Sequence, residues 1–216
     1  MRETVSGPAL ADLLRLLRSR FEAARDRSDA VGAEITAVLA GLDQIGTTPL
    51  AWQATDHPLI RSLPAALDLL APLALEIADV LSRIGSDLPW RYGYAARPDQ
   101  PGLEAAMGWA EIVGPAAPFR SDDVCFGLTL IGPDTHYLPH RHPAVELYHV
   151  LAGTAAWSAA GVTSLRPPGS LILHPANLVH AMRTGPEPLL ALYSWTGDVI
   201  SPSVWADESF DPVEPR

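Results

Sequence analysis

The chain has 216 residues, which is enough for one or two hydrophobic cores. Its hydrophobic content of 48% and charged content of 19% are typical of a globular protein and exclude a disordered one. The formal net charge of −10 argues against a nucleic-acid partner. The sequence has no apolar signal core and no apolar stretch of about 18 residues, so we expect a cytoplasmic protein with no membrane partner.

The first 88 residues are predicted to form helices. Hydrophobic residues recur three or four positions apart in three segments, as on one face of an amphipathic helix. Pro72 falls inside the third segment and predicts a kink or a new helix start. We expect these apolar faces to pack against the rest of the chain or against a second copy in a homodimer, because a soluble monomer rarely exposes them. The residues that define the three faces are Leu10, Leu13, Leu14, Leu17 and Phe21; Val31, Ile35, Val38, Leu39 and Leu42; and Leu67, Leu70, Ala74, Ile77, Leu81 and Ile84.

Residues 89–200 show a different pattern, of short β-type runs separated by glycine and proline turns. Short strands of this kind are typical of a closed antiparallel sandwich or barrel, and the absence of an internal repeat indicates a single one. The segment 103–112 is predicted to be a short helix or a strand that enters the barrel, and residues 201–216 an irregular tail. The predicted strands are 124–131, 145–151, 154–160, 170–173 and 188–196.

The single cysteine, Cys125, excludes an intrachain disulfide. It lies within the apolar run 124–130. We therefore interpret it as a buried structural thiol rather than a nucleophile.

Histidines are concentrated in one part of the chain, where six of the seven lie between positions 136 and 180. His140 and His142 are two apart, so on an extended strand they point to the same face. Glu146 follows four residues later, and the distant His180 can complete the group. Three imidazoles and one carboxylate suit zinc, iron(II) or manganese and are too rich in histidine for magnesium or calcium. We predict one divalent transition metal ion, with zinc or iron(II) preferred and manganese, cobalt and nickel as alternatives.

The spacing His140-x-His142-x3-Glu146-x6-Gly153 resembles the first signature motif of the cupin superfamily. A second cupin motif is matched over residues 169–184, and the two motifs occur in the family order. Asparagine tolerates positive φ better than most residues, so its replacement of a glycine is mild. The departures from the family pattern are Asp134 and Asn177 in place of glycines and Thr184 in place of a final asparagine.

The cupin resemblance covers about residues 124–200. It implies a mainly β fold with a single cupin (jelly-roll) β-barrel that carries the metal site. We assign the barrel to residues 89–200, after an α-helical N-terminal region at 1–88 and before the tail at 201–216.

Tyr148 lies two residues after Glu146, so on a strand it shares the face of that carboxylate and can reach the metal or a metal-bound substrate. The other interpretation is a core tyrosine with its hydroxyl bonded nearby. His140 is the usual fourth ligand of a cupin. The residues therefore leave the fourth ligand open between His140 and Tyr148.

A narrower resemblance is to the cupin-type dimethylsulfoniopropionate lyases of marine bacteria, in which a helical region precedes one cupin core. It implies cleavage of dimethylsulfoniopropionate to dimethyl sulfide and acrylate. The metal would be held by positions matching His142, Glu146, Tyr148 and His180, with His140 close by. Either Tyr148 or Tyr137 would be the base. The positions that carry the resemblance are Tyr137, His140, His142, Glu146, Tyr148, His180, Tyr193 and Trp195.

This chemistry is consistent with the residues present. Elimination removes a proton next to a carboxylate while a sulfonium leaves from the next carbon, and a divalent metal on the carboxylate stabilises the developing charge. A phenol with a pKa of about 10 is a poor base unless a metal favours its phenolate. An aromatic pocket can hold the sulfonium by cation–π attraction, for which we name Trp195 and Tyr193, with His140 beside them. Trp157 is better interpreted as core packing.

Three alternatives remain open at this point. A cupin dioxygenase that uses iron(II) would have the same ligand set but would consume oxygen. An isomerase of sugar phosphates would need Arg or Lys at the mouth, and Arg141 faces away by strand alternation. A non-enzymatic ligand-binding cupin would tolerate loss of ligands, whereas this chain keeps the whole set.

Overall fold

The structure is a computed structural model that describes residues 7–206. Its N-terminal part is helical, as predicted, and the third apolar segment is broken at Pro72 into two helices. Asp29 caps the N-terminus of helix α2, where its carboxylate accepts a hydrogen bond from the Gly32 backbone N–H at 3.1 Å. The helical elements are α1 (Gly7–Glu22), α2 (Ala30–Leu42), η1 (Pro58–Ser62), α3 (Leu63–Leu70), α4 (Leu75–Ile84) and η2 (Gly85–Asp87).

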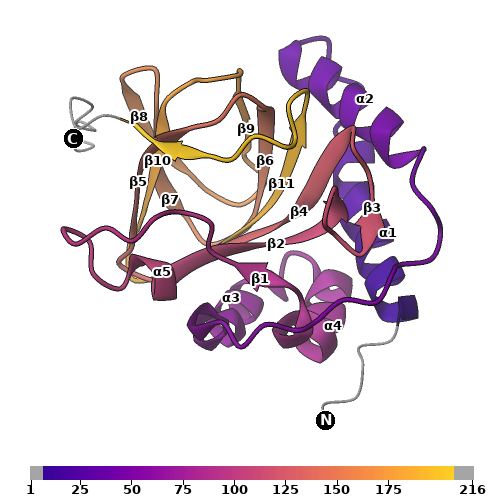
Figure 1. The fold of residues 1–216 in the computed structure, drawn as a ribbon, viewed down its shortest axis with the longest axis horizontal. Helices are drawn as coiled ribbons and strands as arrows, with labels where there is room; N and C mark the ends of the chain where they lie inside the picture. Colours follow the sequence, from indigo (N-terminus) through magenta and orange to yellow (C-terminus); the bar gives the residue numbers. More distant parts are fainter. Residues whose placement is uncertain (1–6, 207–216) are drawn as a thin grey trace.

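The strands that follow form two sheets (Figure 1). The larger sheet has the order β1-β2-β4-β11-β6-β9, with β3 paired to β2, and the smaller has the order β12-β5-β10-β7-β8. The strands of the larger sheet are β1 (Trp90–Arg91), β2 (Met107–Gly114), β3 (Phe119–Arg120), β4 (Val124–Ile131), β6 (Val145–Ala152), β9 (Leu171–His174) and β11 (Leu189–Thr196). Those of the smaller sheet are β5 (His136–Arg141), β7 (Ala155–Ala159), β8 (Val162–Arg166), β10 (His180–Thr184) and β12 (Val204–Trp205).

The predicted fold class is confirmed, and the structure refines it. The mainly β part follows the helices, and its strands form two facing sheets rather than one continuously hydrogen-bonded barrel. The segment 103–112 is both helix and strand, since α5 (Leu103–Ala106) leads directly into β2. Residues 201–206 are not wholly irregular, because β12 pairs with β5; the rest of the predicted tail lies outside the described residues.

The outer face of the larger sheet is covered by the helices (Figure 1). Along β4, every second side chain points to the helices, and Phe126 meets Phe21 of α1 edge-to-face with ring centroids 5.6 Å apart. The leucine faces of the helices are therefore buried within one chain. The homodimer stays a prediction that these faces do not require.

The inner face of the same sheet looks toward the smaller sheet and encloses a second, more aromatic core. Cys125 is buried there, as predicted. Within residues 7–206, no helix is long and apolar enough to cross a membrane. The inner face is where the predicted ligands lie.

Candidate active site

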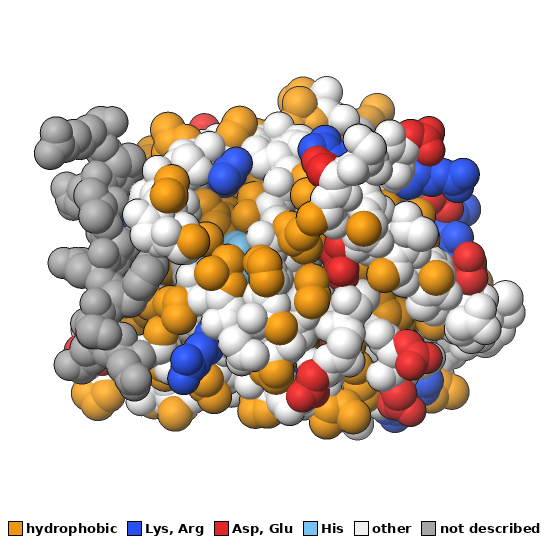
Figure 2. Space-filling model, turned by 90° about the horizontal axis from the view of Figure 1, so that it is seen from above, with side chains coloured by type: hydrophobic (Ala, Val, Ile, Leu, Met, Phe, Trp, Pro, Cys, Tyr) orange, Lys and Arg blue, Asp and Glu red, His pale blue; other side chains and the backbone are white. Residues whose placement is uncertain are grey.

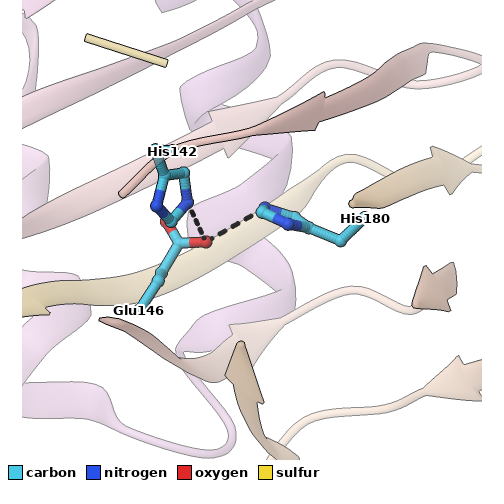
Figure 3. A group of neighbouring side chains, drawn as sticks. All are labelled: His142, Glu146 and His180. Carbon is cyan, nitrogen blue, oxygen red and sulfur yellow. Dashed lines mark hydrogen bonds and ion pairs between the residues drawn. The ribbon is translucent and has the colours of Figure 1, made fainter. Parts of the chain in front are cut away.

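The predicted metal ligands come together between the two sheets (Figure 3). Glu146 is on β6 of the larger sheet, His180 begins β10 of the smaller sheet, and His142 follows the end of β5. Glu146 Oε2 lies 3.1 Å from Nε2 of both histidines. One ligand atom from each of the three residues lies within 4.8 Å of the others, and all three side chains are buried. This group could hold a metal ion.

Local backbone geometry explains how two degenerate motifs still build this site. Asp134 and Asn177, which stand where the cupin motifs have glycine, adopt positive φ angles of 49° and 62°. Asp and Asn tolerate this left-handed region better than other side chains do. The backbone N–H of Asn177 donates to the His142 carbonyl at 2.8 Å and so ties the turn that carries one ligand to the loop before another. Gly153, in contrast, cannot be replaced by another residue, because a Cβ there would lie 2.0 Å from the Pro188 carbonyl oxygen.

Hydrogen bonds to the other ring nitrogens orient the two histidine ligands. Nδ1 of His142 lies 3.1 Å from the Ala144 carbonyl oxygen, and Nδ1 of His180 lies 2.9 Å from that of Leu178. A carbonyl only accepts, so each Nδ1 donates to its carbonyl, and Nε2 is the ring nitrogen that faces the site. Nε2 of His180 is buried and makes no hydrogen bond, although it lies near Glu146. An orphaned nitrogen lone pair beside a carboxylate fits a metal ion.

His140 lies beside this group rather than within it. Its Nδ1 lies 2.8 Å from the Leu138 carbonyl oxygen, and its ring stacks on Tyr137 with centroids 3.9 Å apart. Its ring also meets that of His180 edge-on at 4.1 Å. The ligand atoms that cluster within 4.8 Å include none from His140. Whether His140 or Tyr148 is the fourth ligand stays a prediction.

The structure adds a fourth histidine that the spacing of the motifs does not single out. Trp157 Nε1 donates to Nε2 of His174 at 3.0 Å, so the proton of that ring is on Nδ1, which donates to Glu146 Oε2 at 3.1 Å. Trp195 Nε1 donates to the other carboxylate oxygen at 2.8 Å. Both oxygens of Glu146 are thereby held in place. Trp157 is buried and acts through His174, consistent with its interpretation as a core residue.

The charges of the site are set by burial and by the histidine–carboxylate contacts. Desolvation raises the pKa of Glu146, but its interactions with His142, His174 and His180 outweigh this and hold the pKa well below its usual range. Desolvation lowers the pKa of His142, and the Glu146 charge reverses the shift, so that the pKa is raised. Burial also raises the pKa of Tyr148 and Tyr137 well above that of a free phenol. The protein by itself therefore keeps both tyrosines protonated.

A cavity of about 280 Å³ opens beside the ligand group. Its walls are largely aromatic and include all the tyrosines predicted for the site, Tyr137, Tyr148 and Tyr193, together with Trp195. The Trp195 ring lies over His142 with centroids 4.3 Å apart. Seen from above, hydrophobic side chains spread over the surface, and a histidine is visible in a hollow between them (Figure 2). Residues 199–203, which lead from β11 to β12, line one edge of the cavity.

Two further cavity residues were not anticipated from the sequence. The Tyr94 hydroxyl shares a hydrogen bond with that of Tyr137 at 2.5 Å, so a second phenol is connected to one predicted base. Arg91 also lines the cavity, where it pairs with Glu111. Arg141 is exposed, as strand alternation predicted. Arg91, which lines the cavity, is thus already paired with a carboxylate. This pairing disfavours an isomerase that binds a sugar phosphate.

Comparison with known proteins places this fold and site in one class. The family model for dimethylsulfoniopropionate lyases matches residues 33–191. The chain therefore belongs to the dimethylsulfoniopropionate lyase family.

Individual relatives agree with this assignment. The chain is 29% identical over 202 residues to the dimethylsulfoniopropionate lyase DddQ of Ruegeria pomeroyi, covering 91% of this chain and 93% of that protein. It is 35% identical over 143 residues to a protein of Cereibacter sphaeroides named as the lyase DddL, covering 65% of this chain but only 60% of the relative. The crystal structure of DddQ from R. pomeroyi superposes with a TM-score of 0.78 at 26% identity, covering 95% of this chain and 100% of that structure.

Proposed function

We propose that this protein is a metal-dependent carbon–sulfur lyase that cleaves dimethylsulfoniopropionate to dimethyl sulfide and acrylate by β-elimination. The observation that carries the proposal is the buried group His142, Glu146 and His180 at the wall of an aromatic cavity. Family membership favours the same substrate, since the relatives are named for it.

We propose that His142, Glu146 and His180 hold one divalent transition metal ion, zinc or iron(II), with Tyr148 or His140 as the fourth ligand. The donor set of nitrogens and one carboxylate suits these metals. Tyr148 faces the cavity from the same strand as Glu146, whereas the His140 ring is engaged with Tyr137. These contacts favour Tyr148. When bound, the ion would neutralise the substrate carboxylate and favour a phenolate beside it.

The residues of the chain then have separate tasks. A phenolate of Tyr148 or Tyr137 removes the proton from the carbon next to the carboxylate. As the new carbon–carbon double bond forms, the bond to sulfur breaks, and its electron pair leaves with sulfur as neutral dimethyl sulfide. Tyr94 is hydrogen-bonded to Tyr137 and can share the proton there. Trp195 and Tyr193 would face the sulfonium, where aromatic rings attract a cation by about 0.5–2 kcal/mol each.

The direct test is product analysis on the purified, metal-loaded protein. We expect dimethyl sulfide in the headspace and acrylate in solution in equal amounts, in the absence of oxygen. Oxygen uptake with no dimethyl sulfide would instead favour the iron(II) dioxygenase. Saturable binding of dimethylsulfoniopropionate with neither reaction would favour a non-enzymatic ligand-binding protein.

A further inference from the structure

An ion pair occupies a part of the cavity that the metal group and the predicted base do not use. Glu111 on β2 accepts a hydrogen bond from the Arg91 guanidinium on β1 at 2.5 Å. The two side chains differ in exposure, at 8% for Glu111 and 45% for Arg91. Both line the same cavity as Glu146. The pair therefore has its negative end inside the protein and its positive end near water.

Strand register places this carboxylate in line with the active site. Glu111 pairs with Gly127, Gly127 with Tyr193, and Tyr193 with Tyr148, so the four positions form one row across β2, β4, β11 and β6. Three strand spacings amount to about 14 Å of backbone, and the inward side chains shorten the gap that a ligand must span.

The backbone of β2 lies close to this row at Gly127, between its two ends. Gly127 contributes no side chain, and a Cβ there would lie 2.1 Å from the Ala110 carbonyl oxygen, so the position is restricted to glycine. The neighbouring Tyr193 hydroxyl is buried and has no hydrogen-bond partner among the described residues. A buried polar atom without a partner is uncommon, and here it borders a cavity that a ligand can enter.

The charge of the ion pair acts mainly through its buried end. Burial raises the pKa of Glu111, and the adjacent Arg91 guanidinium opposes this shift. The Arg91 guanidinium also lies 5.9 Å from the centroid of the Trp109 ring. Water screens an exposed charge more strongly than a buried one. The Arg91 charge is therefore screened more than the Glu111 charge at the cavity wall.

We propose that Glu111 is a specificity-determining residue that attracts the cationic end of a zwitterionic substrate, while the metal group holds the carboxylate end. Arg91 keeps Glu111 ionised and limits the strength of that attraction. This inference rests on the proposed function, because it assigns the two ends of the same substrate. It predicts a preference for a cation over a neutral group of the same shape.

The test compares two ligands that differ in one charge. Trimethylammoniopropanoate carries a quaternary cation, and its carbon isostere has a neutral tert-butyl group in the same place. Calorimetric titration of the metal-loaded protein should give tighter binding of the cation. Glu111→Gln should reduce that preference by about tenfold, the scale of one charge interaction at partial burial, and leave the affinity for the neutral ligand unchanged. With dimethylsulfoniopropionate, Glu111→Gln should raise KM more than it lowers kcat.

A matched control separates charge from folding. Glu34 is partly buried on α2, outside the cavity, and accepts a hydrogen bond from Thr196, so Glu34→Gln removes a comparable charge elsewhere. It should leave the preference as in the wild type, and thermal unfolding checks that each variant is folded. An unchanged preference in Glu111→Gln, or an equal loss of affinity for both ligands, would overturn the inference. If the wild type shows the preference but releases no dimethyl sulfide, the proposed reaction fails and the cation site stands.

Discussion

The two faces of the larger sheet are built from the same strands but have different roles. On the outer face, Phe126 and Leu147 pack under the helices in a dry apolar layer. One residue away on each strand, Cys125 and Glu146 point to the inner side, where Glu146 lines a cavity with polar, aromatic and ionisable side chains. Because strand side chains alternate, each strand contributes to stability on one side and to chemistry on the other. Substitutions on the two faces should therefore have separable effects.

The largest effect is expected from removing a metal ligand, in the space between the inner face and the smaller sheet. His180→Ala deletes a buried nitrogen that makes no hydrogen bond among the described residues, so metal content should fall and lyase activity should drop by at least about a hundredfold. Elemental analysis and initial rates measure both. His149→Gln is the matched control, because His149 lies on β6 but faces the helices and stacks with Phe21. Full metal occupancy in a His142→Ala, His180→Ala double variant would refute the ligand assignment.

The next effect concerns the base. Tyr148→Phe and Tyr137→Phe keep the ring and its packing but delete the oxygen, so they test proton transfer rather than folding. At the true base, kcat should fall by at least about a hundredfold, whereas the other variant should change metal affinity or KM. Activity of the wild type should rise with pH as the phenol ionises. Normal rates of dimethyl sulfide release from both variants, folded and metal-loaded, would exclude the tyrosine mechanism.

On the outer face, Phe126→Ala should destabilise the fold without touching the chemistry. Removal of a fully buried phenylalanine costs about 3–5 kcal/mol, and a denaturant titration measures it. The kcat per folded molecule should stay at the wild-type value. A chain shortened to begin near residue 86 would expose the whole outer face, and we expect it to aggregate. If that shortened chain were soluble and fully active, the helical region would be dispensable for folding and for activity.

The smallest effect is a pH dependence of stability that arises on the outer face. Burial lowers the pKa of His149 to about 4, with Arg20 adding to the shift, whereas an unfolded chain has the usual value of about 6.5. The unfolded state thus binds the proton more readily, and the stability that His149 contributes is lost as pH falls from about 6.5 to about 4. In His149→Gln the decline over this window should be shallower. Parallel unfolding curves of variant and wild type would contradict the assignment.

Much of the division between a helix-covered face and a cavity-lining face could be predicted from the sequence. The parts that depend on strand pairing could not. The long apolar strands and the helix faces were readable because their periods are regular. Strands β5 and β10 could not be read from the sequence, because histidines, arginines and Pro139 obscure the alternation of apolar and polar residues there. The grouping of His142, Glu146 and His180 was predicted from their spacing and from the cupin resemblance. Strand register brings His174 and Glu111 to the site, and the loop after β1 brings Tyr94 there. No local sequence pattern marks these contacts.

The measurement that most directly tests the central claim is metal titration of the stripped protein. We predict that chelation abolishes dimethyl sulfide release, and that added zinc or iron(II) restores it in proportion to binding, up to one ion per chain. The His180→Ala variant should not recover at the same metal concentration. Full lyase activity in the metal-free wild type, or recovery that continues far beyond one bound ion, would contradict a single metal centre at His142, Glu146 and His180.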